Sequence, residues 1–401
     1  MTGDLQPCTH PAPPGLKVFL VAVEESGDQL GAALMGALRR RTSAIAFSGV
    51  GGRKMSAEGL VSLHSTDDFS IMGFTAIPQR LPAIVRHLRQ TLRAVRAQRP
   101  DVLIVIDSPG YTQWVARFVR RADPSIPIVG YVSPSVWAWG PSRARSMRRY
   151  IDHVLALLPF EPEVHRRLGG PPCSYVGHPI VEQIAQLRPA PDELERREAR
   201  PPVLLVLPGS RSGEILRHGA IFGDAIGRVH DRLGAFDVVV PTVPHLLDQV
   251  TGTIASWPVR PRVVTDHAEK LAAFRIARAA LAKSGTVTLE LAVAGVPMVA
   301  AYKVSAFDAW LGRRLVSVPS AILANLVIGE NVVPELLQEA CTPERLAAAL
   351  IPVIENTPER RRQVEAFTRL DAIMEIGAGA PASRAVDIVL DVVRRRSHGA
   401  S

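Results

Sequence analysis

Short apolar runs alternate with segments of helical periodicity along most of this chain, and this alternation constrains its fold more than any other feature. The runs 102–106 and 203–207 are continuously apolar, and so is 17–23 after its first residue, Lys17, which indicates strands that are buried on both faces. Segments such as 24–41 repeat their apolar residues at helical spacing. Strands separated by helices form parallel sheets with helices on both faces, so the sequence predicts a doubly wound α/β fold.

A polar, proline-containing stretch at residues 186–202 interrupts the alternation, and we interpret it as a linker between two domains. The length of 401 residues agrees with two domains. Ligands of such sheets bind beyond the carboxyl ends of the strands, so we expect two Rossmann-like domains that face a central cleft. The predicted segments are a disordered leader at 1–16, an N-terminal domain at 17–185, the linker, a C-terminal domain at 203–365, and C-terminal helices at 366–401 that pack back towards the N-terminal domain.

Several classes of protein are disfavoured by what the sequence lacks. Three dispersed cysteines without CxxC spacing argue against a disulfide framework or a zinc site. Without GxxxxGKS or GxGxxG after a strand, a P-loop NTPase and a dinucleotide dehydrogenase are disfavoured, and we expect neither a cofactor nor a metal. The first 16 residues lack the apolar core of a signal peptide, and no apolar run reaches the roughly 18 residues of a membrane span.

A basic amphipathic segment at residues 80–99 offers one clue to a partner. Its apolar residues recur at helical spacing, and its other face carries six arginines and no acidic residue. Such a helix suits an anionic bilayer surface, but an ordinary core-packed helix with a solvated face is equally compatible with the pattern. The net charge of +9 does not choose between these readings, and no recognised motif supports nucleic-acid binding.

Polar residues that follow the apolar runs are the candidate site residues. Asp107 ends the run 102–106 and is either a catalytic base or the cap of the next helix. Ser210 and Arg211 follow a Pro-Gly turn at a predicted helix start, which suits phosphate but also ordinary capping. Glu290 lies one turn into the helix after Ser284, where it could accept ribose hydroxyls or lie at the surface.

Two further segments have both a structural and a functional interpretation. In 24-EESGDQLG-31, Asp28 is stabilised by a helix dipole in the structural reading, whereas the functional reading is a polar pocket for acceptor hydroxyls. Trp137 and Trp139 lie in a proline-rich polar loop, where they could line an acyl or sugar pocket, although core packing is the more frequent fate of a tryptophan.

Nearly the whole chain, from about residue 17 to 390, resembles the lipid-A-disaccharide synthases, which are bacterial glycosyltransferases of lipopolysaccharide assembly. The motifs that carry the resemblance are EESGDQLGA (24–32), GVGGRKMSAEG (49–59), FSIMGF (69–74), DSPGY (107–111), YVSPSVWAW (131–139), HVLALLPFEP (153–162), YVGHP (175–179), LPGSR (207–211), KSGTVTLELAVAGVPMV (283–299) and ILANLVIGENVVPELLQE (322–339).

The resemblance implies a GT-B fold and an inverting transfer of 2,3-diacylglucosamine from its UDP conjugate to 2,3-diacylglucosamine 1-phosphate. It implies that Asp107 is the base, that Ser210 and Arg211 hold the pyrophosphate and that Glu290 holds the ribose. Further positions that match the family are Asn325 and Gln338 near the nucleotide, and Glu24, Ser26 and Asp28 near the acceptor. It also implies a cytoplasmic enzyme, peripheral on the anionic inner membrane, with a homodimer among the expected assemblies and no metal.

The chain departs from the family pattern at four positions, with Val23 for a usual Gly, Gly110 for a second Asp, Gly140 for an Arg and Gly213 for a Ser. These changes leave the base and the pyrophosphate grip in place, so we expect activity, reduced or with a changed acceptor preference. Two alternatives stay open: another GT-B enzyme of UDP-sugars, such as an epimerase, and a non-catalytic lipid-binding relative.

Overall fold

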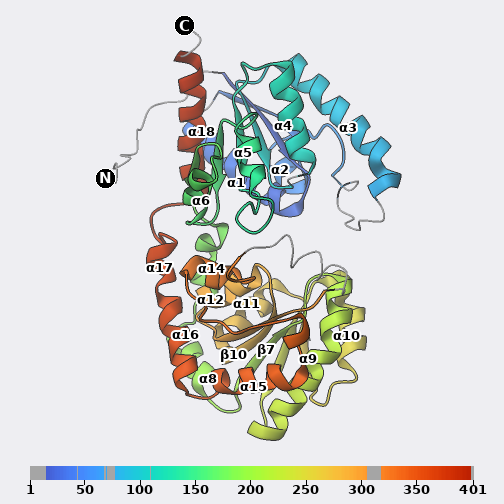
Figure 1. The fold of residues 1–401 in the computed structure, drawn as a ribbon, viewed down its shortest axis with the longest axis vertical. Coiled ribbons are helices and arrows are strands. Elements are labelled where there is room, and N and C mark those ends of the chain that lie inside the picture. The colour runs from blue at the N-terminus through green and yellow to red at the C-terminus, as the bar shows by residue number, and fades with distance from the viewer. Residues whose placement is uncertain are drawn as a thin grey trace. The chain divides into compact units, whose positions relative to one another are not determined.

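The computed structural model describes residues 15–42, 44–66, 69, 77–108, 110–304 and 318–398. All of the predicted leader except residues 15 and 16, and all of the FSIMGF motif except residue 69, therefore lie outside the described residues. The chain divides into two compact units, which are described one by one (Figure 1). Unit 1 comprises Met1–Pro179 and Gly377–Ser401, and unit 2 comprises Ile180–Ile376.

Unit 1 is built on a six-stranded parallel sheet in the order β2-β1-β3-β4-β5-β6. Its strands are β1 (Leu16–Ala22), β2 (Ile45–Val50), β3 (Val102–Ile106), β4 (Ile128–Tyr131), β5 (His153–Ala156) and β6 (Cys173–Tyr175). Its helices are α1 (Glu25–Arg41), α2 (Arg53–Ala57), α3 (Ile77–Gln98), α4 (Tyr111–Ala122), α5 (Ser142–Met147), α6 (Glu161–Arg167) and α18 (Pro381–His398). The chain runs outward from β1 to β2 and then returns to β3 on the other side of β1, so the strand order reverses between β1 and β3.

Both faces of this sheet are covered, which explains the continuously apolar strands. Val18 and Leu20 belong to a core that α1 and α18 complete. Phe19 and Val21, which point to the other face, belong to a core that α3 and α4 complete (Figure 1). A strand with helices on both sides leaves little room for polar residues: every residue of β3 is buried, and so is every residue of β1 except Lys17, near its start.

Unit 2 repeats the architecture with a second six-stranded parallel sheet in the order β12-β11-β10-β7-β8-β9. Its strands are β7 (Val203–Leu207), β8 (Asp237–Pro241), β9 (Arg262–Val264), β10 (Ala279–Lys283), β11 (Met298–Tyr302) and β12 (Glu335–Leu337). Its α-helices are α7 (Ile184–Leu187), α8 (Pro191–Glu198), α9 (Ser212–Leu233), α10 (Leu247–Ile254), α11 (His267–Ile276), α12 (Val287–Val293), α14 (Leu323–Ile328), α15 (Pro343–Ile354), α16 (Pro358–Thr368) and α17 (Leu370–Ile373). Here the strand order reverses between β7 and β10.

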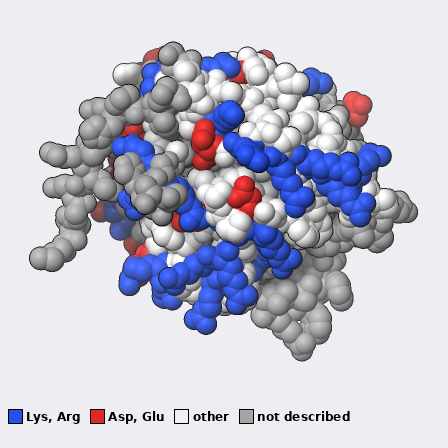
Figure 2. Space-filling view, turned by 90° about the horizontal axis from the view of Figure 1, so that it is seen from above, with Lys and Arg blue, Asp and Glu red and all other residues white. Residues whose placement is uncertain are grey.

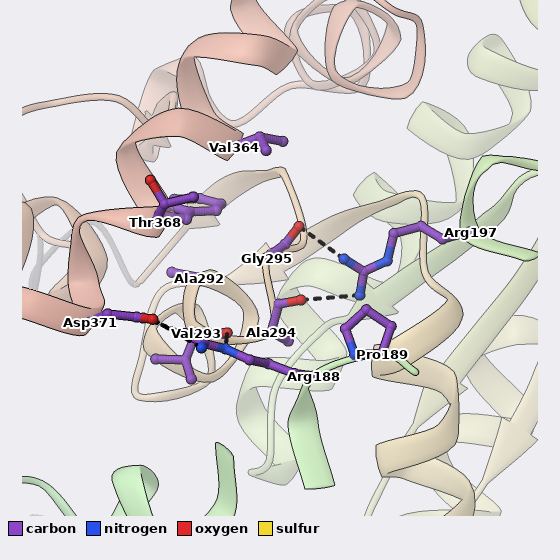
Figure 3. A pocket seen from close by; sticks show the side chains of 11 residues that line it. Arg188, Pro189, Arg197, Ala292, Val293, Ala294, Gly295, Val364, Thr368 and Asp371 are labelled. Carbon is purple, nitrogen blue, oxygen red and sulfur yellow. Dashed lines mark hydrogen bonds and ion pairs between the residues drawn. The ribbon is translucent and has the colours of Figure 1, made fainter. Parts of the chain in front are cut away.

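The segment 186–202, which we predicted to be a linker, contains α8 and packs within unit 2. Its Arg197 is buried and donates hydrogen bonds to the carbonyl groups that end α11 and α12. The four acceptors are the carbonyl oxygens of Phe274, Arg275, Ala294 and Gly295, of which the last two are seen in Figure 3. Because helix ends leave carbonyls unsatisfied and a guanidinium offers five donors, one buried arginine joins both helices.

The predicted C-terminal helices at 366–401 divide between the units. The end of α16 and all of α17 lie in unit 2, where Arg188 forms an ion pair with Asp371 beside a cavity of about 310 Å³ (Figure 3). Only α18 belongs to unit 1, where it packs on α1. The cavity lies where α12 ends, at the amino edge of the strands, and therefore away from the edge at which such sheets bind ligands.

Candidate functional site

The two points at which strand order reverses single out two groups of residues. In doubly wound sheets, ligands bind beyond the carboxyl ends of the strands at such a point. In unit 1 this places residues after β1 and β3, namely Glu24 and Asp107, at the candidate edge. In unit 2 it places the turn after β7, with Ser210 and Arg211, beside the end of β10 at Lys283. Each edge is described by itself.

Asp107 is partly exposed in unit 1, and its carboxylate is held by two neighbouring groups. Its Oδ2 accepts a hydrogen bond of 2.7 Å from the Ser26 hydroxyl, and its Oδ1 accepts one of 2.8 Å from the Ser108 backbone N–H. Its φ is 54° and that of Ser108 is 43°, so two successive non-glycine residues adopt the left-handed conformation. Such strain is typical of functional sites, and here it directs a carboxylate to the sheet edge.

The other two predicted acceptor-side residues differ in kind. Glu24 is partly buried at the N-terminal end of α1, with no hydrogen bond of its side chain to the helix start. Asp28 is 6% exposed, and its carboxylate accepts hydrogen bonds from the backbone N–H groups of Gly52, Lys54 and Met55. Asp28 therefore caps the start of a neighbouring helix, α2. The structural interpretation expected only a favourable interaction with the dipole of its own helix.

The two tryptophans of the loop after β4 have different environments. Trp137 packs edge-on against Phe160 and donates a hydrogen bond of 3.2 Å from its Nε1 to Glu161. Trp139 is 46% exposed, with the Arg143 guanidinium 3.6 Å from the centroid of its ring. Burial raises the pKa of Glu161 to about 7, against hydrogen bonds that lower it. One tryptophan thus anchors the loop and the other is left at the surface.

The unit 2 edge concentrates charged groups around the start of α9. Ser210 and Arg211 are exposed, and Arg211 is the N-terminal flanking residue of the helix. Glu214, one turn into the helix, accepts a hydrogen bond of 3.0 Å from the Ser210 N–H and forms an ion pair of 2.9 Å with Lys283. Burial acts to raise the pKa of Glu214, but Lys283, the Ser210 N–H and Arg211 outweigh it and hold this pKa below its usual value.

Glu290 also has a cationic partner. Its Oε2 lies 2.8 Å from the Lys270 ammonium, and both side chains are partly exposed, at 28% and 31%. Glu290 comes from α12 and Lys270 from α11, the two helices whose ends Arg197 joins. The carboxylate remains accessible to a ligand, as its predicted contact with a ribose requires.

Asn325 and Gln338 form structural hydrogen bonds. Asn325 is 2% exposed, and its side-chain amide makes four hydrogen bonds, which use its full donor and acceptor capacity. The partners are the Val333 carbonyl, the Glu335 carboxylate and the N–H groups of Val332 and Val333. Gln338, partly exposed and with a φ of 51°, accepts a long hydrogen bond of 3.4 Å from the Val304 N–H. Asn325 thus holds the loop before β12 instead of offering a polar atom to a ligand.

Sequence reasoning assigned no role to three residues that the structure brings to these edges: Glu214, Lys283 and Tyr111. Tyr111 begins α4 just after Asp107, its hydroxyl lies 3.0 Å from the Thr91 hydroxyl, and burial raises its pKa to about 12. Two features of the sequence could have indicated the unit 2 residues. Lys283 ends an apolar strand, and Glu214 lies one turn into the helix that follows the Ser210–Arg211 turn. Within residues 15–398, apart from those left undescribed, no three metal-ligating side chains are grouped to hold an ion.

Comparison with known proteins connects this geometry to a family. The model of the lipid-A-disaccharide synthetase family matches residues 18–386. The chain belongs to this family. The lipid-A-disaccharide synthase of Rhodopseudomonas palustris (strain HaA2) is 60% identical over 380 residues, which is 94% of this chain and 97% of the relative. The resemblance is confirmed, and the chain is a glycosyltransferase of lipid A biosynthesis with lipid-A-disaccharide synthase activity.

Solved structures with similar folds support the fold of this lipid-A-disaccharide synthetase family member. A putative UDP-N-acetylglucosamine 2-epimerase from Listeria monocytogenes matches with a TM-score of 0.60 at 12% identity, covering 95% of this chain and 97% of that one. The calicheamicin glycosyltransferase CalG4 matches with a TM-score of 0.57 at 18% identity, covering 95% and 98%. At these identities the matches support the GT-B fold alone, as predicted.

Two departures from the lipid-A-disaccharide synthetase pattern lie at the candidate edges. A Cβ on Gly110 would meet no atom within 4 Å, so a side chain there is not sterically excluded. A Cβ on Gly213 would meet only the Arg217 side chain, at 3.8 Å. Neither glycine is required by packing, and each leaves more open space beside its edge than the usual family residue would.

Proposed function

We propose that this enzyme transfers 2,3-diacylglucosamine from its UDP conjugate to the 6-hydroxyl of 2,3-diacylglucosamine 1-phosphate, with inversion. The donor's C1–O bond to the β-phosphate breaks as the acceptor oxygen bonds to C1, and UDP leaves. The acceptor proton passes to a carboxylate, which we assign to Asp107. The observation that carries this assignment is the Ser26–Asp107 hydrogen bond of 2.7 Å at the point of strand reversal in unit 1.

The geometry around Asp107 suits a base. Each carboxylate oxygen accepts one hydrogen bond, from Ser26 or Ser108, which fixes the orientation of the group. A carboxylate oxygen accepts about two hydrogen bonds, so capacity remains for the acceptor hydroxyl. We propose that Ser26 orients Asp107, that Glu24 contacts acceptor hydroxyls, and that Asp28 acts indirectly by fixing α2.

Unit 2 supplies the complementary role. We propose that Arg211 and the first N–H groups of α9 bind the diphosphate and stabilise the charge that develops on it as UDP leaves. Arg211 suits this role because its planar guanidinium can grip two phosphate oxygens. Glu290 would accept the ribose hydroxyls, while Asn325 and Gln338 would shape the nucleotide pocket from behind through the loops that they hold.

A direct assay tests the reaction. The full chain is incubated with the UDP-diacylglucosamine donor and the monosaccharide 1-phosphate, and the products are analysed by mass spectrometry. We expect equal amounts of UDP and of the β-1,6-linked disaccharide 1-phosphate. Formation of an epimerised UDP-sugar would favour the alternative GT-B enzyme, and UDP binding without turnover would favour a non-catalytic relative.

We further propose that unit 1 docks on the anionic, cytoplasmic surface of a membrane. Both acylated substrates would be presented there. Four arginines of α3, Arg86, Arg89, Arg93 and Arg96, are exposed, and three of them line a hollow of about 340 Å³. The adjacent helix α4 exposes Trp114 and Phe118. Figure 2, which views unit 1 from above, shows broad groups of Lys and Arg with isolated acidic side chains between them.

This combination fits a membrane interface, because arginines attract anionic lipid headgroups and aromatic side chains insert at the boundary. None of the described helices is long and apolar enough to cross a bilayer. Co-sedimentation with phosphatidylglycerol vesicles tests the proposal. The double variant Arg89→Gln/Arg93→Gln should bind several-fold more weakly, while Arg166→Gln, on α6, serves as the control. Equal binding of the double variant and the control would remove α3 from the role.

We also propose a homodimer, and this rests on the family resemblance. Analytical ultracentrifugation of the full chain would test it, with a monomer across the micromolar range as the contrary outcome.

A further inference from the structure

The Glu214 carboxylate connects the Ser210–Arg211 turn to Lys283 at the unit 2 edge. One oxygen of Glu214, Oε2, accepts the Ser210 N–H at 3.0 Å, and the other, Oε1, lies 2.9 Å from the Lys283 ammonium. Glu214 is 8% exposed and packs under the turn at Gly209, where a Cβ would come within 2.5 Å of the Glu214 Cβ. The turn, the helix start and Lys283 thus form one connected arrangement that converges on a negative group.

Lys283 reaches this position because of the sheet topology. It is the last residue of β10, which pairs with β7 so that Ala282 lies opposite Leu207, just before the Pro-Gly turn. Its ammonium lies 5.2 Å from the centroid of the Tyr302 ring, and its side chain is 18% exposed. At the reversal between β7 and β10, Lys283 of β10 therefore lies beside the Ser210–Arg211 turn that follows β7.

The helix that carries Glu214 is fixed from behind by a histidine. His218 Nδ1 lies 2.8 Å from the Glu214 carbonyl oxygen, and its Nε2 lies 3.0 Å from the Lys303 N–H. The carbonyl can only accept and the N–H can only donate, so these partners assign the proton to Nδ1 of a neutral ring. Glu214 is thereby anchored to the end of β11 as well as to Lys283.

We propose that Lys283 is a direct contact of the diphosphate in the transfer reaction, and that Glu214 is its positioning residue. The inference rests on the proposed function of the Ser210–Arg211 turn. An ammonium has three donors, and Glu214 engages one, which leaves two for phosphate oxygens. When the C1–O bond breaks, negative charge accumulates on the β-phosphate, and Lys283 would share its stabilisation with Arg211.

The ion pair is poorly explained by stability alone. A mostly buried ion pair contributes little net stability compared with apolar residues of similar volume, since desolvation offsets the attraction. A lysine that is required for an anionic ligand, however, needs a carboxylate to hold it in place until the ligand arrives. The location at the strand reversal, rather than the ion pair itself, is what points to a ligand.

Binding measurements on the full chain test the proposal. The dissociation constants of UDP, UMP and uridine are measured for the wild type, Lys283→Met and Lys283→Arg. We expect Lys283→Met to weaken UDP binding roughly 10-fold or more, with uridine binding within twofold of the wild type, and Lys283→Arg to lie in between. Arg228 lies on α9, the helix that carries Glu214, and forms an ion pair with Glu344 of α15. Arg228→Met is therefore the matched control and should change neither UDP nor uridine binding.

A second pair of variants separates a phosphate contact from simple neutralisation of Glu214. If Lys283 only masks the carboxylate, the double variant Lys283→Met/Glu214→Gln should bind UDP as tightly as the wild type, and that result would overturn the proposal. If Lys283 contacts the diphosphate, the double variant should bind UDP roughly 10-fold more weakly than Glu214→Gln alone. Equal loss of UDP and uridine binding in Lys283→Met would also overturn it, as a defect of folding. A wild type that binds no UDP would instead reject the proposed function itself.

Discussion

The carboxyl edges of the two sheets have the same topology and opposite chemistry. In unit 1 the strand reversal between β1 and β3 presents carboxylates, with Asp107 oriented by Ser26. In unit 2 the reversal between β7 and β10 presents cations, with Lys283 held by Glu214 beside Arg211. In both units the backbone fixes the edge at which a ligand can bind, while a few residues after each strand decide whether that edge is acidic or basic.

Removal of the negative charge at the unit 1 edge should have the largest effect. Asp107→Asn should lower kcat by about 10³-fold, because the amide cannot take the acceptor proton. UDP binding, which we assign to unit 2, should stay within twofold of the wild type. Steady-state transfer assays and calorimetric UDP titration measure the two effects. An Asp107→Asn enzyme as active as the wild type would exclude the base role.

The second prediction concerns the buried acid that anchors the loop beside this edge. Burial raises the pKa of Glu161 to about 7, so the folded protein holds a proton that the unfolded chain releases near 4.5. The contribution of this proton to the free energy of unfolding is fully present below about pH 4.5. It is lost as the pH rises through 7. Glu161→Gln mimics the protonated acid, so its stability relative to the wild type should rise by on the order of 3 kcal/mol as the pH increases from 4.5 to 8.

Thermal unfolding of both proteins across that range measures the difference. The histidines His153 and His165, whose pKa values burial lowers, are present in both proteins and cancel in the comparison. A constant difference in Tm from pH 4.5 to 8 would show that Glu161 does not titrate in this range.

The third prediction removes a cation from the unit 2 edge. Arg211→Ala should weaken UDP binding by about 10- to 100-fold, as expected for the loss of charge-assisted hydrogen bonds to phosphate. Its effect on uridine binding should be small, and Tm should hardly change because Arg211 is exposed. A salt titration sharpens the test, since wild-type affinity should fall more steeply with ionic strength than that of the variant. Unchanged UDP affinity would remove Arg211 from the site.

The smallest expected effect separates a structural carboxylate from a catalytic one on the same edge. Asp28→Ala should lower the free energy of unfolding by about 1–2 kcal/mol, since three N–H groups at the start of α2 lose their acceptor. We expect kcat to fall far less than in Asp107→Asn. Urea unfolding and transfer assays measure both, and a loss of activity equal to that of Asp107→Asn at unchanged stability would give Asp28 a direct role.

Much of the fold was predictable from local pattern. The apolar runs at 18–23 and 203–207 predicted β1 and β7, since a strand that is covered on both faces is apolar along most of its length. The segment 186–202 was less transparent: its polar composition suggested a linker, yet α8 folds against α11 and buries Arg197. The acceptors of that arginine are backbone carbonyls about 80 to 100 residues away, which leave no mark in the sequence.

The sequence by itself determined the two parallel sheets, the family and the residue types at the strand ends, because each depends on periodicity and local motifs. Only the tertiary structure decided what each polar residue does. It turned Asp28 and Asn325 inward to backbone partners, left Asp107 partly exposed, and brought Lys283 to Glu214 across 69 positions of sequence. A side chain's role depends on which donors and acceptors surround it, and those come from distant segments that only folding brings together.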